Sequence, residues 1–165
     1  MANKILQIPE PAITWLATGG TNDFTPTSLA VDAGHQGALH DFGASAHARR
    51  YTWRAWCKFA SAPTVGDIVE VYWKSSDLIT LGHPDNDDGT GDIALSAEDK
   101  LRNLQPLGVI QVDEALTTVE MVGHRSMFVD SRYGGPVFFN RTSVALSATA
   151  ADMGFQLIAM VDEIQ

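Results

Sequence analysis

The stretch YTWRAWCKF, residues 51–59, decides the fold that this 165-residue chain predicts. Side chains of a β-strand alternate between its two faces, so every second residue of the stretch lies on the same side. One side is apolar and is expected to face a core: Tyr51, Trp53, Ala55, Cys57 and Phe59. The other side is hydrophilic except for one tryptophan at its centre: Thr52, Arg54, Trp56 and Lys58.

Three explanations of Trp56 are open at this point. The strand lies at the centre of a sandwich and a loop or the N-terminal segment packs over its outer face. Alternatively, Trp56 lies at a subunit interface, where tryptophan, tyrosine and arginine are enriched. The third explanation, a stacking platform for a sugar ring, ranks lower, because no acidic or amide partner can be placed beside the ring from the sequence.

The neighbouring sequence repeats the strand pattern. Residues 62–67 predict a turn, and IVEVYWKSSD (68–77) alternates again, so the two runs are expected to pair antiparallel with Trp53 and Trp73 in one core. Further short strand-like runs lie at residues 4–8, 12–16, 28–33, 107–113, 117–123, 126–133, 136–142 and 155–164. One helix is expected at 96–104, with Ser96 as its cap and Asp99 completing the capping box.

Roughly eight to ten short strands and one small helix predict an all-β protein, a single β-sandwich of the jelly-roll type. Proline residues interrupt the chain near its start, and residues 1–27 are expected to form an extended N-terminal arm. The sandwich domain is then expected to occupy residues 28–165.

Composition excludes several classes of function. The net charge is −9, from 20 acidic and 11 basic residues, which disfavours a phosphate backbone as the main partner. No segment approaches the about 20 apolar residues of a membrane helix, so we expect a protein made in the cytoplasm without a membrane partner. The single cysteine, Cys57, lies on the apolar side of its strand and is expected to be buried.

Two groups of polar residues are candidate metal sites. The acidic loop 85–92, with Asp85, Asp87, Asp88 and Asp92, does not fit an EF-hand and is interpreted as a solvated turn, with a different kind of calcium loop as the alternative. The histidines His35, His40 and His47, with Asp41 among them, match no compact zinc pattern. No nucleophile, phosphate-loop or metalloprotease motif is present, so we expect neither a cofactor nor an enzyme.

The second half of the chain resembles a known class of proteins. SAEDKLRNLQPLGVIQVDEA (96–115) and RYGGPVFFNRTSVALSATAADMGFQLIAMVDEIQ (132–165) are similar to small virion structural proteins of tailed bacteriophages. The shared features are an R-Y-x-x-P-V-x-x-N strand, an ALS-x-T-A segment and a terminal DEIQ. The resemblance covers roughly residues 50–165, and the first 45 residues carry none of it.

The resemblance implies a capsid decoration (cement) protein on the exterior of the virion. Such a protein binds the major capsid protein, commonly as a homo-oligomer with a trimer favoured, and stabilises the head without any chemical step. We expect the contacts at apolar bulk where an isolated domain would carry polar groups: Trp15 and Phe24 on the arm, and Arg54 and Trp56 on the two-sided strand.

Two alternatives remain. A carbohydrate-binding or receptor-binding β-sandwich module of a fibre or tail would use exposed aromatic side chains with nearby Asp or Asn. A small enzyme of the cupin type ranks last, because the histidines fall in expected loops and not on strands.

Overall fold

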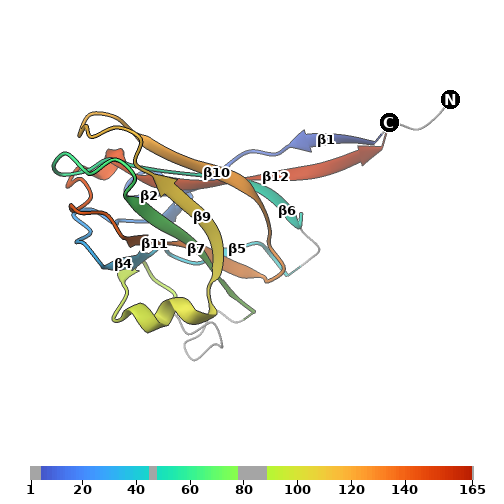
Figure 1. Ribbon diagram of the computed structural model, residues 1–165. Coiled ribbons are helices and arrows are strands. Elements are labelled where there is room, and N and C mark those ends of the chain that lie inside the picture. Colours follow the sequence, from blue (N-terminus) through green and yellow to red (C-terminus); the bar gives the residue numbers. More distant parts are fainter. Residues whose placement is uncertain (1–4, 45–47, 78–88, 165) are drawn as a thin grey trace.

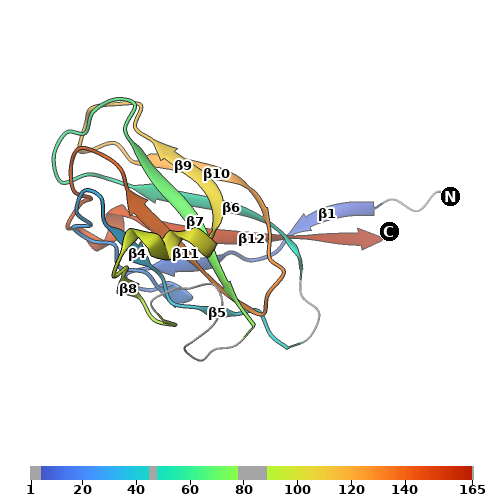
Figure 2. The ribbon, with the colours of Figure 1, turned by 60° about the horizontal axis from the view of Figure 1, so that its bottom comes forward.

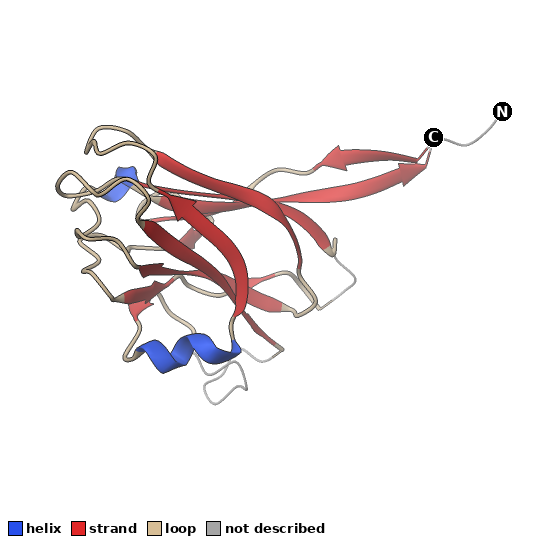
Figure 3. Ribbon diagram, in the orientation of Figure 1, coloured by secondary structure: helices blue, strands red, loops and turns tan. Residues whose placement is uncertain are grey.

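Two β-sheets pack face to face in the computed structural model, which describes residues 5–44, 48–77 and 89–164 (Figures 1 and 3). The first sheet has the order β10 (Met121–Phe128), β6 (Arg50–Cys57), β12 (Gly154–Ile164), β2 (Ile13–Leu16) and β3 (Asn22–Asp23), and β1 (Ile5–Pro9) pairs with the end of β12. The second sheet has the order β8 (Ile93–Ala94), β4 (Gly34–Gln36), β11 (Tyr133–Asn140), β7 (Ile68–Ser76) and β9 (Gln105–Gln111), and β5 (His40–Asp41) pairs with β11.

The order of the main strands is that of a jelly roll. Four of them form the first sheet in the order β2-β12-β6-β10, and four form the second in the order β4-β11-β7-β9. A strand from the first part of the chain therefore lies beside one from the last part in each sheet, β2 beside β12 and β4 beside β11, as in a double Greek key. The expected all-β sandwich of jelly-roll type is confirmed.

The core forms from the inward-facing sides of β6, β7 and β12. Trp53 stacks on Phe155 with 6.0 Å between ring centroids, and Trp73 lies 6.0 Å from the same phenylalanine. Trp53 and Trp73 are each 1% exposed. The expected common core of these two tryptophans is confirmed, and the alternation that predicted it continues through Tyr51, Ala55 and Cys57, which are all buried.

Several local expectations need correction. The helix is a 3-10 helix, η1 (Glu98–Asn103), and it begins after the extended residue Ala97 without the expected side-chain cap from Ser96. A second 3-10 helix, η2 (Ala150–Asp152), was not expected. Within the described residues, no helix is long and apolar enough to cross a membrane.

The expected strands at 117–123 and 126–133 are one strand, β10, because its pairing with β6 runs without a break from Met121 to Phe128. The expected strand at 28–33 is a turn region instead. Ser28 and Asp32 have φ angles of 55° and 54°, which lie in the left-handed region and are incompatible with a strand.

The structure also corrects the extent of the arm. β2 pairs with β12 inside the first sheet, and Trp15 and Phe24 are both 0% exposed. The part that extends from the sandwich is shorter and contains both ends of the chain. It consists of β1 and residues 160–164 of β12, here called the terminal ribbon, and it stands out to the right in Figure 1.

Candidate partner-binding site

Trp56 lies on the outer face of the first sheet, as the alternation predicts. In the register of the sheet it is flanked by Val122 of β10 on one side and Gly154 of β12 on the other. Val122 is 40% exposed, and the indole of Trp56 is half-buried. The row across these three strands is therefore apolar on a face where water would favour polar side chains.

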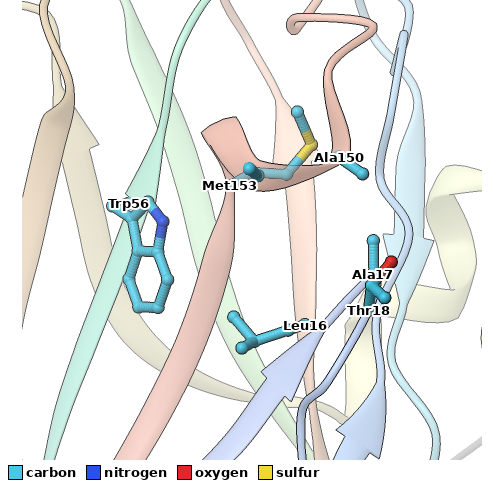
Figure 4. A pocket seen from close by; sticks show the side chains of 7 residues that line it. Leu16, Ala17, Thr18, Trp56, Ala150 and Met153 are labelled. Atoms are coloured by element: carbon cyan, nitrogen blue, oxygen red, sulfur yellow. The ribbon is translucent and has the colours of Figure 1, made fainter.

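Beside Trp56 the surface is hollowed into an apolar pocket of about 350 Å³. Figure 4 shows the indole on one side and Leu16, with the segment after it, on the other. The described lining residues come from β6, the end of β2 and the segment around η2: Leu16, Ala17, Thr18, Trp56, Ala150, Ala151 and Met153. None of these side chains is ionisable, so the lining offers neither a general base nor a charged nucleophile.

The indole is held in place by its strand neighbours. The guanidinium carbon of Arg54 lies 4.9 Å from the centroid of the Trp56 ring, and Arg54 Nη2 donates to Glu120 Oε1 at 2.9 Å. Across the sheet, a Cβ atom on Gly154 would lie 2.4 Å from Cζ2 of Trp56, so only glycine leaves room for the ring there. One face of the Trp56 indole is thus covered by the guanidinium of Arg54, and the edge of the ring packs against the backbone at Gly154.

The η2 side of the pocket is held by a charged pair. Lys58 Nζ donates to Asp152 Oδ1 at 2.9 Å, and the hydroxyl of Ser147 donates to Asp152 Oδ2 at 2.7 Å. The hydrogen bond from Ser147, followed by that from Lys58, holds the pKa of Asp152 below its ordinary value. This contact connects the end of β6 to the segment that carries Ala150 and Met153, and so preserves the shape of the pocket.

The outer face of the second sheet is covered, in contrast. There η1 places Leu101 and Leu104 over Val137 and Phe139 of β11, and these four side chains form a second buried cluster. Figure 2 shows η1 lying across that sheet. Both β6 and β11 carry bulk on two faces, but only β11 has a covering element within the described residues.

Arg141 fastens η1 to the second sheet. It forms ion pairs with Asp32, Glu70 and Glu98, and its guanidinium carbon lies 4.1 Å from the centroid of the Phe139 ring. With three carboxylates around it, this arginine is saturated and does not form an anion-binding site.

The open face also carries positive charge on an acidic protein. Arg50 lies on the same side of β6 as Arg54 and Trp56, is exposed and forms no ion pair with any described residue. His124 lies opposite Arg54 in the register, and the exposed side chain of Phe128 lies opposite Arg50. Apolar side chains and an unpaired cation, Arg50, therefore occupy the same face of the first sheet.

Two of the four expected contact residues meet at this site and two do not. Arg54 and Trp56 lie together beside the pocket. Trp15 and Phe24 are unavailable to a partner because they are core residues. Nε1 of Trp15 donates to the carbonyl of Ala38 at 2.8 Å, and Phe24 packs edge-on against Phe138 at 4.8 Å.

Sequence reasoning did not find Leu16, Ala150 and Met153. Leu16 follows a core tryptophan and so falls on the outer side of its strand by simple alternation, which is a usable signal. The η2 segment has no periodicity, and nothing in the sequence indicates that it closes one side of the pocket.

The histidines expected at the surface are separated by their own contacts. His35 Nε2 lies 2.7 Å from Asp92 Oδ1, and His40 Nδ1 lies 3.2 Å from the side-chain amide nitrogen of Asn22. Burial lowers the pKa of His40, although the charge of Asp41 opposes this shift. His47 lies outside the described residues.

In the described part of the chain, no group of three or more histidine, cysteine or acidic side chains is arranged to hold a metal ion. Asp85, Asp87 and Asp88 of the acidic loop lie outside the described residues. Asp92 accepts hydrogen bonds from the backbone amide and the hydroxyl of Thr25. Its carboxylate is thus engaged by Thr25 and His35.

Comparisons with known proteins give no match. No family model matches the chain, and no curated protein matches it either.

Proposed function

We propose that this protein is a non-enzymatic docking protein that binds a neighbouring protein subunit through the outer face of its first sheet. The observation that carries the proposal is the apolar pocket beside Trp56, on a face that no described element covers. The equivalent face of the second sheet is covered by η1. An apolar side chain of the partner enters the pocket, and a carboxylate of the partner lies near Arg54.

The physical basis is the cost of leaving this face in water. Apolar patches on a soluble monomer are usually small, and a larger one with a polar rim is typical of an interaction site. Arginine and tryptophan are the side chains that most often supply binding energy at protein interfaces. Here Trp56 and Arg54 are already stacked, so little conformational entropy is lost when a partner docks.

We further propose that the partner is the major capsid protein of a tailed bacteriophage and that the chain decorates the exterior of the virion. Support comes from the resemblance of residues 96–115 and 132–165 to phage virion proteins and from the jelly-roll sandwich. The net charge of −9 is suited to a protein that does not bind nucleic acid. Binding only to the assembled shell adds its binding free energy to shell stability.

The test is binding of the purified chain to heads that lack it. In Trp56→Ala the affinity is expected to fall at least about thirtyfold, because a central interface tryptophan typically contributes 2 kcal/mol or more. The matched control is Leu116→Ala, which removes an apolar side chain that is 50% exposed in the β9–β10 connection. Its affinity is expected to remain that of the unchanged protein.

Equal affinity of Trp56→Ala and the unchanged protein would contradict the proposed site. Localisation by electron microscopy of virus particles tests the proposed partner separately, because density elsewhere than on the head surface would exclude it.

A carbohydrate-binding module is the second candidate, because Trp56 borders an open pocket that also contains the hydroxyl of Thr18. The cation of Arg54 on the indole counts against it, since sugar stacking needs a free aromatic face. Saturable binding on a glycan array that is lost in Trp56→Ala would replace the capsid proposal with this one.

A further inference from the structure

The terminal ribbon is a separate feature from the pocket. β1 pairs with β12 over five positions, from Ile5 opposite Ile164 to Pro9 opposite Met160. On the other side of β12, the pairing with β6 ends where Tyr51 meets Ala159. Beyond Ala159, no described strand lies along that edge of β12, and the ribbon stands clear of the sandwich in both views (Figures 1 and 2).

The ribbon prolongs the core-facing side of the first sheet, but no described strand of the second sheet packs opposite it. Phe155, Leu157 and Ala159 of β12 face the core, and Val161 is the next residue on the same side. Val161 is 37% exposed, and its register partner Ile8 is 38% exposed. An isolated two-stranded ribbon is at best marginally stable in water, so this one requires a further surface.

Charge distinguishes the two ends of the ribbon. Asp162 and Glu163 occupy the register positions opposite Gln7 and Leu6, toward its free end. Arg50 lies at its base, since the next residue of β6, Tyr51, pairs with Ala159. Arg49 and Arg50 are exposed and unpaired among the described residues. Two acidic residues of β12 therefore occupy register positions toward the free end of the ribbon, and two unpaired arginines lie at its base.

An antiparallel arrangement of two such ribbons brings each free end to the base of the other. A strand edge pairs with an identical edge about a two-fold axis, because antiparallel pairing relates equivalent residues symmetrically. In such a pair, the terminal part of β12 from the second copy would continue in line with β6 of the first copy. Its Asp162 and Glu163 would then lie near Arg49 and Arg50 of that copy.

We infer that the open edge of β12 pairs with the same edge of a second copy of this chain, which yields a two-fold dimer. Its central sheet has four strands in the order β1, β12, β12 and β1. The ribbon and the Trp56 pocket are different surfaces, so the dimer does not depend on the proposed function. A two-fold pair also differs from the trimer that the resemblance implies.

The experiment is sedimentation equilibrium of the full chain over a range of concentrations. A reversible dimer is expected. Arg50→Glu and Asp162→Arg, at positions on the same face of the sheet, should each raise the dimer dissociation constant about five- to thirtyfold, because each change affects two symmetric contacts. The combined variant should recover most of the affinity, since the opposite charges are restored in exchanged positions.

The matched control is Arg102→Glu, the same charge change at an exposed residue of η1. It is expected to leave the dimer unchanged. As an independent readout on the unchanged protein, hydrogen exchange of the amides of residues 160–164 should slow as dimer forms. A monomer at every concentration, a trimer, or a dimer insensitive to both single charge reversals would overturn the inference.

Discussion

Trp56 and Gly154 are register partners on β6 and β12, and the indole of Trp56 lies over the space where a side chain at 154 would begin. A Cβ atom there would approach Cζ2 of Trp56 to 2.4 Å and Cδ2 of Leu16 to 2.7 Å. The requirement for glycine is therefore steric. The position of the pocket wall depends on a missing side chain in the neighbouring strand.

Gly154→Ala is expected to displace Trp56 and Leu16 and to lower the free energy of unfolding by about 1–3 kcal/mol, the usual range for overpacking. Chemical denaturation measures this change. Gly91→Ala is the matched control, because a Cβ atom at Gly91 would meet nothing within 4 Å. Equal stability of the two variants would show that the indole moves aside without cost.

Asn140 connects three segments inside the protein. Its side chain is fully buried, and Nδ2 donates to the carbonyls of Leu29, Ala30 and Val144 at 3.0, 3.2 and 2.9 Å. Its Oδ1 accepts from the amide and the hydroxyl of Thr142. Every hydrogen-bonding position of this amide is thus used.

Asn140→Asp retains the shape but replaces the donor by an oxygen that faces carbonyl groups. We expect it to lower the free energy of unfolding by about 3–5 kcal/mol at neutral pH, the range for an uncompensated buried charge. The folded protein would raise the pKa of the new carboxyl above its unfolded value. The deficit relative to the unchanged protein should therefore shrink as the pH falls.

Urea unfolding at several pH values measures both effects. Gln111→Glu, which adds the same charge at an exposed strand position, serves as the control and should show little loss. A deficit for Asn140→Asp that does not depend on pH would contradict the electrostatic explanation.

The parts of the fold that could be predicted are those with a local period of two. In 51–59 and 68–77, alternation alone places Trp53 and Trp73 inside and Trp56 outside. This works because each strand is long and its inward and outward sides differ in polarity. The number of such short runs predicts a sandwich of the jelly-roll type.

Trp15 and Phe24 could not be placed in this way. They lie in short segments between prolines and glycines, and their partners are distant in sequence, since Trp15 pairs with Phe155 and Phe24 packs on Phe138. The burial of Trp15 and Phe24 therefore depends on long-range pairing and not on the local composition of the sequence. The same holds for the pocket, where Met153 meets Trp56 only after β12 has joined β6.

Cys57 offers a direct probe of the folded core. Its side chain is 0% exposed, and burial, followed by the negative charge of Glu120, raises the pKa of the thiol. A thiol reagent is expected to modify it at least about a thousandfold more slowly in the native protein than in denaturant, because the thiolate is rare and inaccessible. Absorbance of the released chromophore measures the rate. Comparable rates with and without denaturant would contradict the burial of this strand face.

Asp92 connects β4 to the segment before β8, and its titration should make the stability of the folded protein depend on pH. Burial alone would raise its pKa, but hydrogen bonds from His35 and Thr25 outweigh this, so the pKa of Asp92 lies below its ordinary value. A carboxyl with a lowered pKa in the folded state stabilises the protein above its unfolded pKa of about 4. That contribution is lost as the pH falls through the folded value.

Asp92→Asn replaces one acceptor oxygen by an NH2 group, so the hydroxyl of Thr25 loses the acceptor to which it donates. We expect the free energy of unfolding to fall by about 1–3 kcal/mol at neutral pH. At acidic pH, below the lowered pKa of Asp92, the carboxyl of the unchanged protein is itself protonated and the difference between the two proteins should narrow. Asp130→Asn, at an exposed position, is the matched control and should change little at either pH. A deficit of the same size at both pH values would show that shape, and not the charge of Asp92, accounts for the contact.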